Sequence, residues 1–175
     1  EVVQYEDYTL EIEIVGNEIP SEVFIKIDGN SFRIKSNSNT TFEHLFKGVN
    51  ADISFQFLAG GYHSNYYTLK ALPQPKVVNL NAFLNYPNYT KIKDEVIKNN
   101  GDLIIPEGTI VQWDASLQNT KNISLIFSKI KHQQSTNNSF TYKRAFFSST
   151  PYQIITQNEH QLSDSLSYYI KVIPD

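Results

Sequence analysis

The stretch YPNYTKIKDEVIKNNGDLIIPEGTIVQW, from Tyr86 to Trp113, decides the fold because it places turns between short apolar segments. The Tyr86-Pro87 step ends an extended run, since proline fixes φ and offers no donor to a sheet. Asn99–Gly101 and Pro106–Gly108 are predicted turns, because glycine reaches positive φ without steric cost. Leu103–Ile105 and the segment that ends at Trp113 are therefore predicted to be strands.

Outward from this stretch, apolar and polar residues alternate along most of the chain, which is typical of strands with one buried face. In the first half, Asp28-Gly29-Asn30 is a hairpin signal between two such runs. About six or seven short strands in each half predict the fold class as all-β, with two tandem immunoglobulin-like antiparallel β-sandwich domains. The expected inward sets are Tyr8, Leu10, Ile12, Ile14; Val23, Ile25, Ile27; Ile53, Phe55, Phe57; Val111, Trp113, Ala115; Ile123, Leu125, Phe127; Phe140, Tyr142; and Leu166, Tyr168, Ile170, Val172.

One segment leaves its structure open. Lys91–Asn99, KIKDEVIKN, is the best helical candidate in the chain. It is predicted to form either one or two helical turns or an ordered irregular loop before Gly101.

The two halves end alike. YTLKALP (Tyr67–Pro73) and YYIKVIP (Tyr168–Pro174) lie 101 positions apart, since 168 − 67 and 174 − 73 both give that offset. Two more pairs of segments match in pattern: ISFQF (Ile53–Phe57) with YQIIT (Tyr152–Thr156), and EIPSEVFIKI (Glu18–Ile27) with LIIPEGTIVQW (Leu103–Trp113). Three matched pairs that occur in the same order in both halves favour a duplicated module.

The domain boundary follows from this repeat. Pro73–Lys76 reads as a short, stiff linker, because two of its four residues are proline. We therefore predict one sandwich over residues 1–73 and a second over residues 74–175. The second is longer because of an insertion at about residues 86–101.

Composition narrows the function classes. The 175 residues are 40% hydrophobic and 19% charged, which indicates a globular chain. A net charge of −3 leaves no basic surplus to neutralise phosphates, so nucleic-acid binding is not expected. The chain has no cysteine, which excludes disulfides, thiolate metal sites and cysteine nucleophiles.

The sequence contains no methionine, begins at Glu1 without a signal-peptide pattern, and has no long apolar run. We expect it to be a fragment of a longer or processed chain. Any membrane anchor or signal peptide would then lie outside it.

The pattern YPxYT, DE and NxGDLxIPEGTxVxW, here Tyr86–Thr90, Asp94-Glu95 and Asn99–Trp113, resembles a family of large membrane-anchored envelope proteins of unknown function from Gram-negative bacteria. Segments Ile19–Ile27 and Phe55–Ala59 fit the same family. The resemblance implies tandem immunoglobulin-like modules that face the periplasm, with an anchor near the N-terminus of the parent protein. It supplies no catalytic residue.

One position departs from that family's pattern. Lys91 stands where the resemblance leads us to expect a glycine after YPxYT, which would loosen the turn.

Candidate catalytic and metal-binding residues are few. The histidines His44, His63, His132 and His160 have no partner at ligand spacing. The Asp94-Glu95 pair and Glu107 could act as an acid/base pair, or bind calcium with Asp102, but no D-x-D-x-D-G loop accompanies them. Around His160 there is no nucleophile elbow, so a hydrolase is the weakest hypothesis. We predict no catalytic residue, no metal site and no cofactor.

Tyrosines are the stronger binding candidates, because exposed aromatic rings stack on sugars or anchor partner proteins. Tyr62, Tyr66 and Tyr89 are the predicted ligand-binding residues. Tyr62 and Tyr66 follow Gly60-Gly61, and Tyr89 follows Pro87. The competing interpretation places Tyr67, Tyr86 and Trp113 in the sandwich cores and the joint between the modules. Trp113 is expected in the core, because it shares a face with Val111.

The leading hypothesis is therefore a non-catalytic structural or interaction module. Its expected location is the periplasm, in the extracytoplasmic part of a membrane-anchored protein. Its expected partners are other domains of the same parent chain or envelope proteins, and it would meet the membrane only through an anchor outside this fragment. The alternative is a carbohydrate- or peptide-binding module that uses exposed tyrosines.

Overall fold

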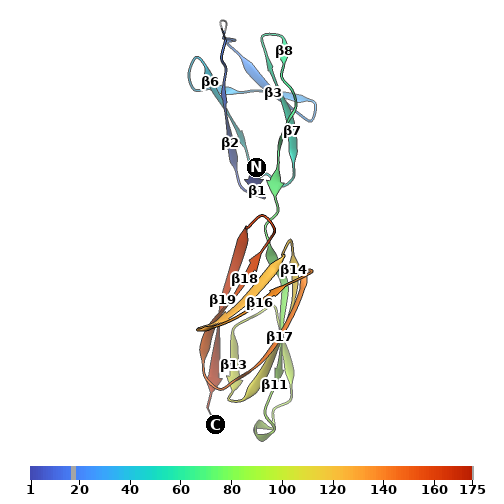
Figure 1. The fold of residues 1–175 in the computed structure, drawn as a ribbon, viewed down its shortest axis with the longest axis vertical. Helices are drawn as coiled ribbons and strands as arrows, with labels where there is room; N and C mark the ends of the chain where they lie inside the picture. Colours follow the sequence, from blue (N-terminus) through green and yellow to red (C-terminus); the bar gives the residue numbers. More distant parts are fainter. Residues whose placement is uncertain (17–18, 175) are drawn as a thin grey trace. The chain divides into compact units, whose positions relative to one another are not determined.

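The computed structural model describes residues 1–16 and 19–174. The chain divides into two compact units, residues 1–73 and 74–175, coloured from blue to green and from green to red in Figure 1. Each unit has its own hydrophobic core. No helix among the described residues is long and apolar enough to cross a membrane.

The described residues of unit 1 form ten strands in three sets of pairings. β2, β6 and β5 form one antiparallel sheet, in the order β2-β6-β5. A second sheet has the order β4-β3-β7-β8, with β9 also paired to β7, and β1 pairs in parallel with β10. The strands are β1 (Val2–Val3), β2 (Tyr8–Glu13), β3 (Val23–Ile27), β4 (Asn30–Arg33), β5 (Lys35–Ser36), β6 (Thr41–Phe46), β7 (Ile53–Ala59), β8 (Tyr62–His63), β9 (Tyr67–Leu69) and β10 (Ala71–Leu72).

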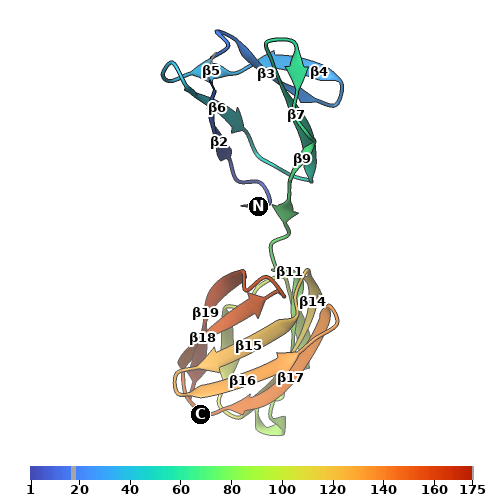
Figure 2. The ribbon, with the colours of Figure 1, turned by 45° about the horizontal axis from the view of Figure 1, so that its top comes forward.

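Unit 2 is a larger two-sheet sandwich. One sheet has the order β12-β11-β14-β17, and the other has the order β13-β19-β18-β15-β16, most of which is visible in Figure 2. Among the described residues 74–174, β13 alone runs parallel to its neighbour, β19. The elements are β11 (Lys76–Asn85), the 3-10 turn η1 (Asn88–Thr90), β12 (Glu95–Lys98), β13 (Leu103–Pro106), β14 (Thr109–Gln118), β15 (Asn122–Phe127), β16 (Ile130–Ser135), β17 (Ser139–Phe146), β18 (Thr150–Gln157) and β19 (Ser163–Ile173).

The two units share one strand plan. In each, a short early strand runs parallel to the last strand (β1 with β10, β13 with β19). The next strand pairs with a later strand in one sheet (β2 with β6, β14 with β17), and the following one pairs with a still later strand in the other sheet (β3 with β7, β15 with β18). This two-sheet, cross-connected plan is that of immunoglobulin-like sandwiches. The predicted fold class is confirmed.

The repeated sequence at the ends of the two units lies on equivalent strands. Ala71 and Leu72 pair with β1 as Val172 and Ile173 pair with β13, at the same offset of 101 positions that the sequence shows. The second match joins equivalent strands but is two residues out of register. Phe55, and not Ile53, is equivalent to Tyr152. Phe55 pairs with Tyr67, and Tyr152 pairs with Tyr168, which is the same tyrosine of the repeat.

The third sequence match is wrong. Its first member covers β3, which is equivalent to β15, whereas its second member covers β13 and β14. Glu18, at the start of that match, lies outside the described residues. Alternating apolar residues occur in every half-buried strand, so this pattern identifies a strand without saying which one.

The segment Lys91–Asn99 is neither of the two predicted structures. Glu95–Lys98 forms β12, which pairs antiparallel with the outer edge of β11, and Ile97 faces buried Ala82 across the pair. The β-branched residues Val96 and Ile97 suit such a strand. The remainder of the insertion is a loop with the single turn η1.

The core of unit 2 surrounds Trp113, which is fully buried as predicted. Its indole Nε1 donates a hydrogen bond of 3.1 Å to the Tyr152 hydroxyl, which donates in turn to the Gly101 carbonyl at 2.7 Å. A Cβ at position 101 would overlap the Tyr168 ring, so the close approach requires glycine there. The chain of bonds joins the two sheets to the loop after β12.

Candidate functional site

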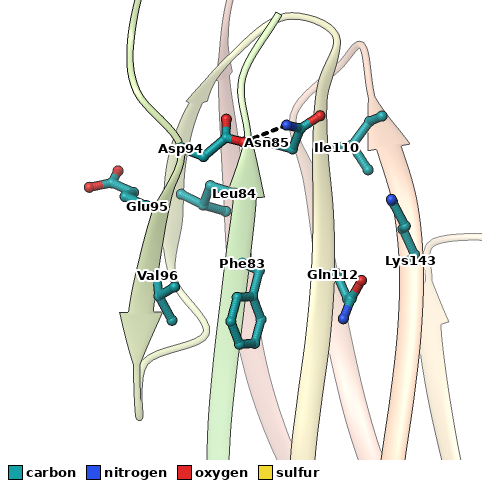
Figure 3. Close-up of a pocket in the computed structure, with 9 residues that line it drawn as sticks. All are labelled: Phe83, Leu84, Asn85, Asp94, Glu95, Val96, Ile110, Gln112 and Lys143. Atoms are coloured by element: carbon teal, nitrogen blue, oxygen red, sulfur yellow. Dashed lines mark hydrogen bonds between the residues drawn. The ribbon is translucent and has the colours of Figure 1, made fainter.

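Residues of the Tyr86–Trp113 stretch form hydrogen bonds with one another at the end of β11 in unit 2. Asp94 accepts a hydrogen bond from the Asn85 side chain at 2.6 Å, drawn in Figure 3, and another from the Tyr86 backbone N–H at 3.0 Å. Both oxygens of this carboxylate thus bind the end of β11. The first acidic residue of the motif therefore closes its own loop.

Glu95 has a similar role. It accepts a hydrogen bond from the Tyr86 hydroxyl, and Tyr86 itself is only 9% exposed. Burial, and then the bond to Glu95, raise the pKa of the Tyr86 hydroxyl above its ordinary value. Tyr86 thus belongs to the core, which is the alternative that the sequence left open for it.

The YPNYT segment is tied to the next turn. The Tyr89 hydroxyl donates to the Glu107 carbonyl at 2.7 Å, and Thr90 Oγ1 donates to the Pro87 carbonyl at 2.8 Å. After η1, Lys91 has a φ of 57°, the left-handed conformation in which glycine is favoured. The glycine that the family pattern suggests at position 91 thus has a conformational reason.

The acidic residues considered for calcium or acid/base chemistry are separated by these roles. Asp102 Oδ1 accepts a hydrogen bond from the Tyr169 backbone at 2.8 Å, on β19. Asp94 and Glu95 bind the β11 end of the loop. Within residues 1–16 and 19–174, no group of three or more His, Asp or Glu side chains is arranged to hold a metal ion.

A shallow groove lies beside this loop, on the outer face of the β12-β11-β14-β17 sheet. Val96, Phe83, Gln112 and Lys143 face one another in register across the four strands, and Figure 3 shows them along the groove. Its volume is about 210 Å³, below the usual range of small-molecule pockets. The groove is therefore too small for a substrate-sized ligand.

The predicted ligand-binding tyrosines are exposed but are not brought together in one unit. Tyr62 is 82% exposed and lines a groove of about 420 Å³ in unit 1, beside Phe24 and the Gly60-Gly61 turn. Tyr66 is 67% exposed and does not line this groove. Tyr89 is 50% exposed and belongs to unit 2.

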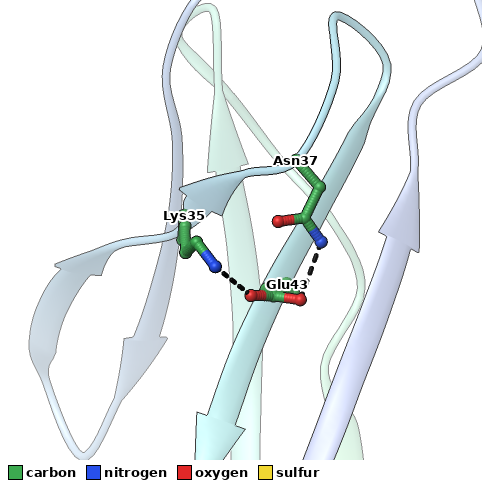
Figure 4. A network of polar contacts seen from close by, with 3 residues as sticks. All are labelled: Lys35, Asn37 and Glu43. Atoms are coloured by element: carbon green, nitrogen blue, oxygen red, sulfur yellow. Dashed lines mark hydrogen bonds and ion pairs between the residues drawn. The ribbon is translucent and has the colours of Figure 1, made fainter.

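A polar network occupies one edge of unit 1 (Figure 4). Glu43 accepts hydrogen bonds from Asn37 at 2.7 Å and from Lys35 at 2.6 Å. These two bonds, that of Asn37 first, lower the pKa of the Glu43 carboxyl. The next residue, His44, is half-buried against Phe46, and burial lowers its pKa. The network crosslinks β5 to β6.

One site escaped the sequence analysis. Arg144 follows the inward set Phe140 and Tyr142 at the same spacing of two, and buried Phe146 continues it. The sequence could have indicated this site, because a cationic residue stands at an inward position of the strand that normally holds an apolar residue. Arg144 and its neighbours line a cavity of about 400 Å³, which lies within the range of ligand sites.

Comparison with known proteins adds a likeness of fold. No protein family and no curated protein matches the chain. Among solved structures, a chimeric tandem of titin Z1Z2 domains is 12% identical, covers 98% of this chain and 93% of its own, and has a TM-score of 0.39. Fibronectin(III)-like modules of Clostridium thermocellum CbhA are 10% identical, with 99% and 90% coverage and a TM-score of 0.39.

The N-terminal Ig1-2 module of the Drosophila receptor protein tyrosine phosphatase DLAR is 12% identical, with 98% and 93% coverage and a TM-score of 0.36. At such identities the likeness concerns the fold alone. The immunoglobulin-like assignment rests on the strand order and pairing described above.

Proposed function

We propose that this chain is a non-catalytic structural and interaction module from the extracytoplasmic part of a membrane-anchored bacterial envelope protein. The observation that carries the proposal is the self-bonding of the Tyr86–Trp113 stretch. Asp94 and Glu95 border the shallow groove of about 210 Å³, but their carboxylates accept hydrogen bonds from Asn85 and Tyr86 at the end of β11. Residues used in this way support an architectural role.

The proposed location is the periplasm, and it is supported by the family resemblance of the same stretch. The proposed partners are other domains of the parent chain or envelope proteins, with the membrane reached only through an anchor outside this sequence. Protease added to intact cells, to cells with a permeabilised outer membrane and to lysed cells would test the location. Digestion of the parent protein only after complete lysis would contradict it.

The architectural role is tested by stability. Asp94→Ala removes the acceptor of two hydrogen bonds, so we expect the free energy of unfolding of unit 2 to fall by about 1 kcal/mol. The measurement is urea unfolding of the full chain followed by Trp113 fluorescence, which reports unit 2 because the chain has a single tryptophan. Glu159→Ala, at an exposed carboxylate in the same unit, is the matched control.

A carboxylate that serves catalysis or ligand binding commonly costs stability, so its removal leaves stability unchanged or raises it. An Asp94→Ala variant that is as stable as the wild type, or more stable, would overturn the architectural role.

A second candidate function rests on Tyr62, whose ring is 82% exposed beside a groove of suitable size. It is a carbohydrate- or peptide-binding module with its site in unit 1. A glycan and peptide array, followed by calorimetric titration of any hit, tests it with Tyr62→Ala. Phe32→Ala, at a ring 48% exposed in the same unit, is the control. A ligand that binds Tyr62→Ala as well as the wild type removes this candidate.

A further inference from the structure

The inner face of β17 carries an arginine where the sandwich calls for an apolar side chain. Arg144 pairs with Val111, which is fully buried, and its neighbours on the same face include Tyr142 and Phe146. A side chain at this position projects between the two sheets, because successive residues of a strand face opposite ways. The sandwich therefore holds a permanent positive charge at its inner edge.

The surroundings of this charge are aromatic. The guanidinium carbon lies 5.0 Å from the centre of the Phe127 ring and 5.4 Å from that of Phe146. Nη1 is buried and has no hydrogen-bond partner among the described residues. Ring faces attract a cation but do not accept all of its N–H groups. A buried donor without an acceptor is rare in folded proteins and calls for an explanation.

The cavity around Arg144 has room for an acceptor from outside. Its volume is about 400 Å³, and it lies between the β15–β16 turn and the loop from β17 to β18. Lys129 adds a second positive charge, and no acidic side chain lines the cavity. Serine and threonine hydroxyls, including those of Ser148 in that loop and Thr150 at the start of β18, supply polar groups on one wall.

The rim of the cavity is apolar. Phe147 is 67% exposed and Ile130 is 49% exposed, so both can contact a ligand that enters. β17 is also an edge strand, since β14 is its single neighbour in the part of the sheet that the structure describes. Extended peptides bind such edges as an added strand.

We propose that the Arg144 cavity binds a carboxylate of an extended peptide that carries an apolar residue beside it. The guanidinium fork matches the two oxygens of a carboxylate, and its Nη1 has no hydrogen-bond partner among the described residues. Phe147 and Ile130 then cover the apolar neighbour of the bound carboxylate. The proposal goes beyond the architectural role and is independent of Tyr62.

The test titrates the full chain with N-acetyl-phenylalanine and follows Trp113, whose ring centre lies 5.6 Å from that of Phe127. N-acetyl-phenylalaninamide has the same ring without the carboxylate. We expect the amide to bind at least about tenfold more weakly, because the charge-assisted bonds are lost. Equal affinity for the two compounds overturns the proposal.

Variants locate the site. Arg144→Gln should weaken N-acetyl-phenylalanine about tenfold or more, whereas Lys143→Gln should leave binding within about twofold. Lys143 is the matched control, because it is the adjacent cation and faces the outer side of the same strand. If Arg144→Gln does not fold, Phe147→Ala at the exposed rim replaces it and should also weaken binding. If Arg144→Gln and Phe147→Ala bind N-acetyl-phenylalanine as tightly as the wild type does, the proposal is wrong.

Two further measurements test other anionic ligands and a role of Arg144 in preventing self-association. Glucuronate or inorganic phosphate binding more tightly than N-acetyl-phenylalanine would contradict the peptide assignment. An inward charge can also guard an edge strand against pairing with another copy. An Arg144→Gln variant that self-associates, in a protein whose wild type binds none of the probes, would assign Arg144 to that protective role and overturn the proposal.

Discussion

Trp113 and Tyr152 show what single residues contribute to this fold. They lie on β14 and β18, in different sheets, and their rings are 5.5 Å apart between centres. Antibody domains join the corresponding pair of strands by a disulfide. This chain has no cysteine, and a hydrogen bond from the indole to the Tyr152 hydroxyl connects its two sheets instead.

Removal of this hydroxyl should destabilise unit 2. Tyr152→Phe leaves the Trp113 N–H and the Gly101 carbonyl without their partner, so we expect the free energy of unfolding to fall by about 1–3 kcal/mol. Urea unfolding followed by Trp113 fluorescence measures it. Tyr169→Phe, at a residue 49% exposed, is the control. Equal stability of the two variants would show that the bonded chain contributes nothing net.

At the scale of one element, β12 and its loop show how tertiary pairing selects a conformation. The segment contains charged residues that suit a helix, yet Val96 and Ile97 pair with β11. The pairing covers residues 81–84 on the outer edge of β11, which would otherwise be open. Sheet edges are commonly covered in this way, because their unpaired backbone groups attract other chains.

The backbone conformation of Lys91, in the turn before β12, predicts how substitutions at this position change stability. Lys91 has a φ of 57°, which costs an L-residue roughly 1–2 kcal/mol and a β-branched residue more. Lys91→Val should therefore lower the stability of unit 2 by about 1 kcal/mol. Lys91→Gly should leave stability within about 0.5 kcal/mol, because relief of strain is offset by the entropy of glycine in the unfolded chain.

Chemical denaturation of the two Lys91 variants and the wild type provides the measurement. Two variants of equal stability would contradict a left-handed conformation at this position.

On the scale of the whole molecule, the tyrosines with raised pKa values all belong to unit 2. Burial is the main cause for Tyr86, Tyr152 and Tyr168. In unit 1, the shifted groups are Glu43 and His44, whose pKa values are lowered. Among the described residues, unit 2 is therefore the part of the chain with a specific sensitivity to alkaline pH.

The direction of this sensitivity follows from proton linkage. A tyrosine with a raised folded-state pKa holds its proton above pH 10, where the unfolded chain has released it. Its contribution is complete below about pH 10 and is lost as the pH rises toward the folded-state pKa. We expect the urea midpoint of unit 2, followed by Trp113 fluorescence, to be steady from pH 8 to about pH 10 and to fall above it.

Tyr152→Phe should make this decline less steep, because it removes one of the three linked groups. A midpoint that rises above pH 10 in the wild type would contradict the raised pKa values.

The sequence alone determined the features that depend on neighbouring residues. Alternation at spacing two gave the inward sets, and these residues pack in or against the two cores. Asp28 and Gly29 form the predicted hairpin turn with φ values of 47° and 84°. The repeated ending of the chain located equivalent strands, because identical positions at one offset carry register as well as pattern.

Only the tertiary structure decided the features that depend on distant partners. β12 became a strand because β11 offered an edge, and the third sequence match failed because alternation does not specify which strand pairs with which. Asp94 and Glu95 found their partners at Asn85 and Tyr86. The position of Arg144 beside Phe127 likewise required two sheets to meet. Backbone periodicity is a local property, whereas strand pairing and side-chain partners are selected by the whole packed chain.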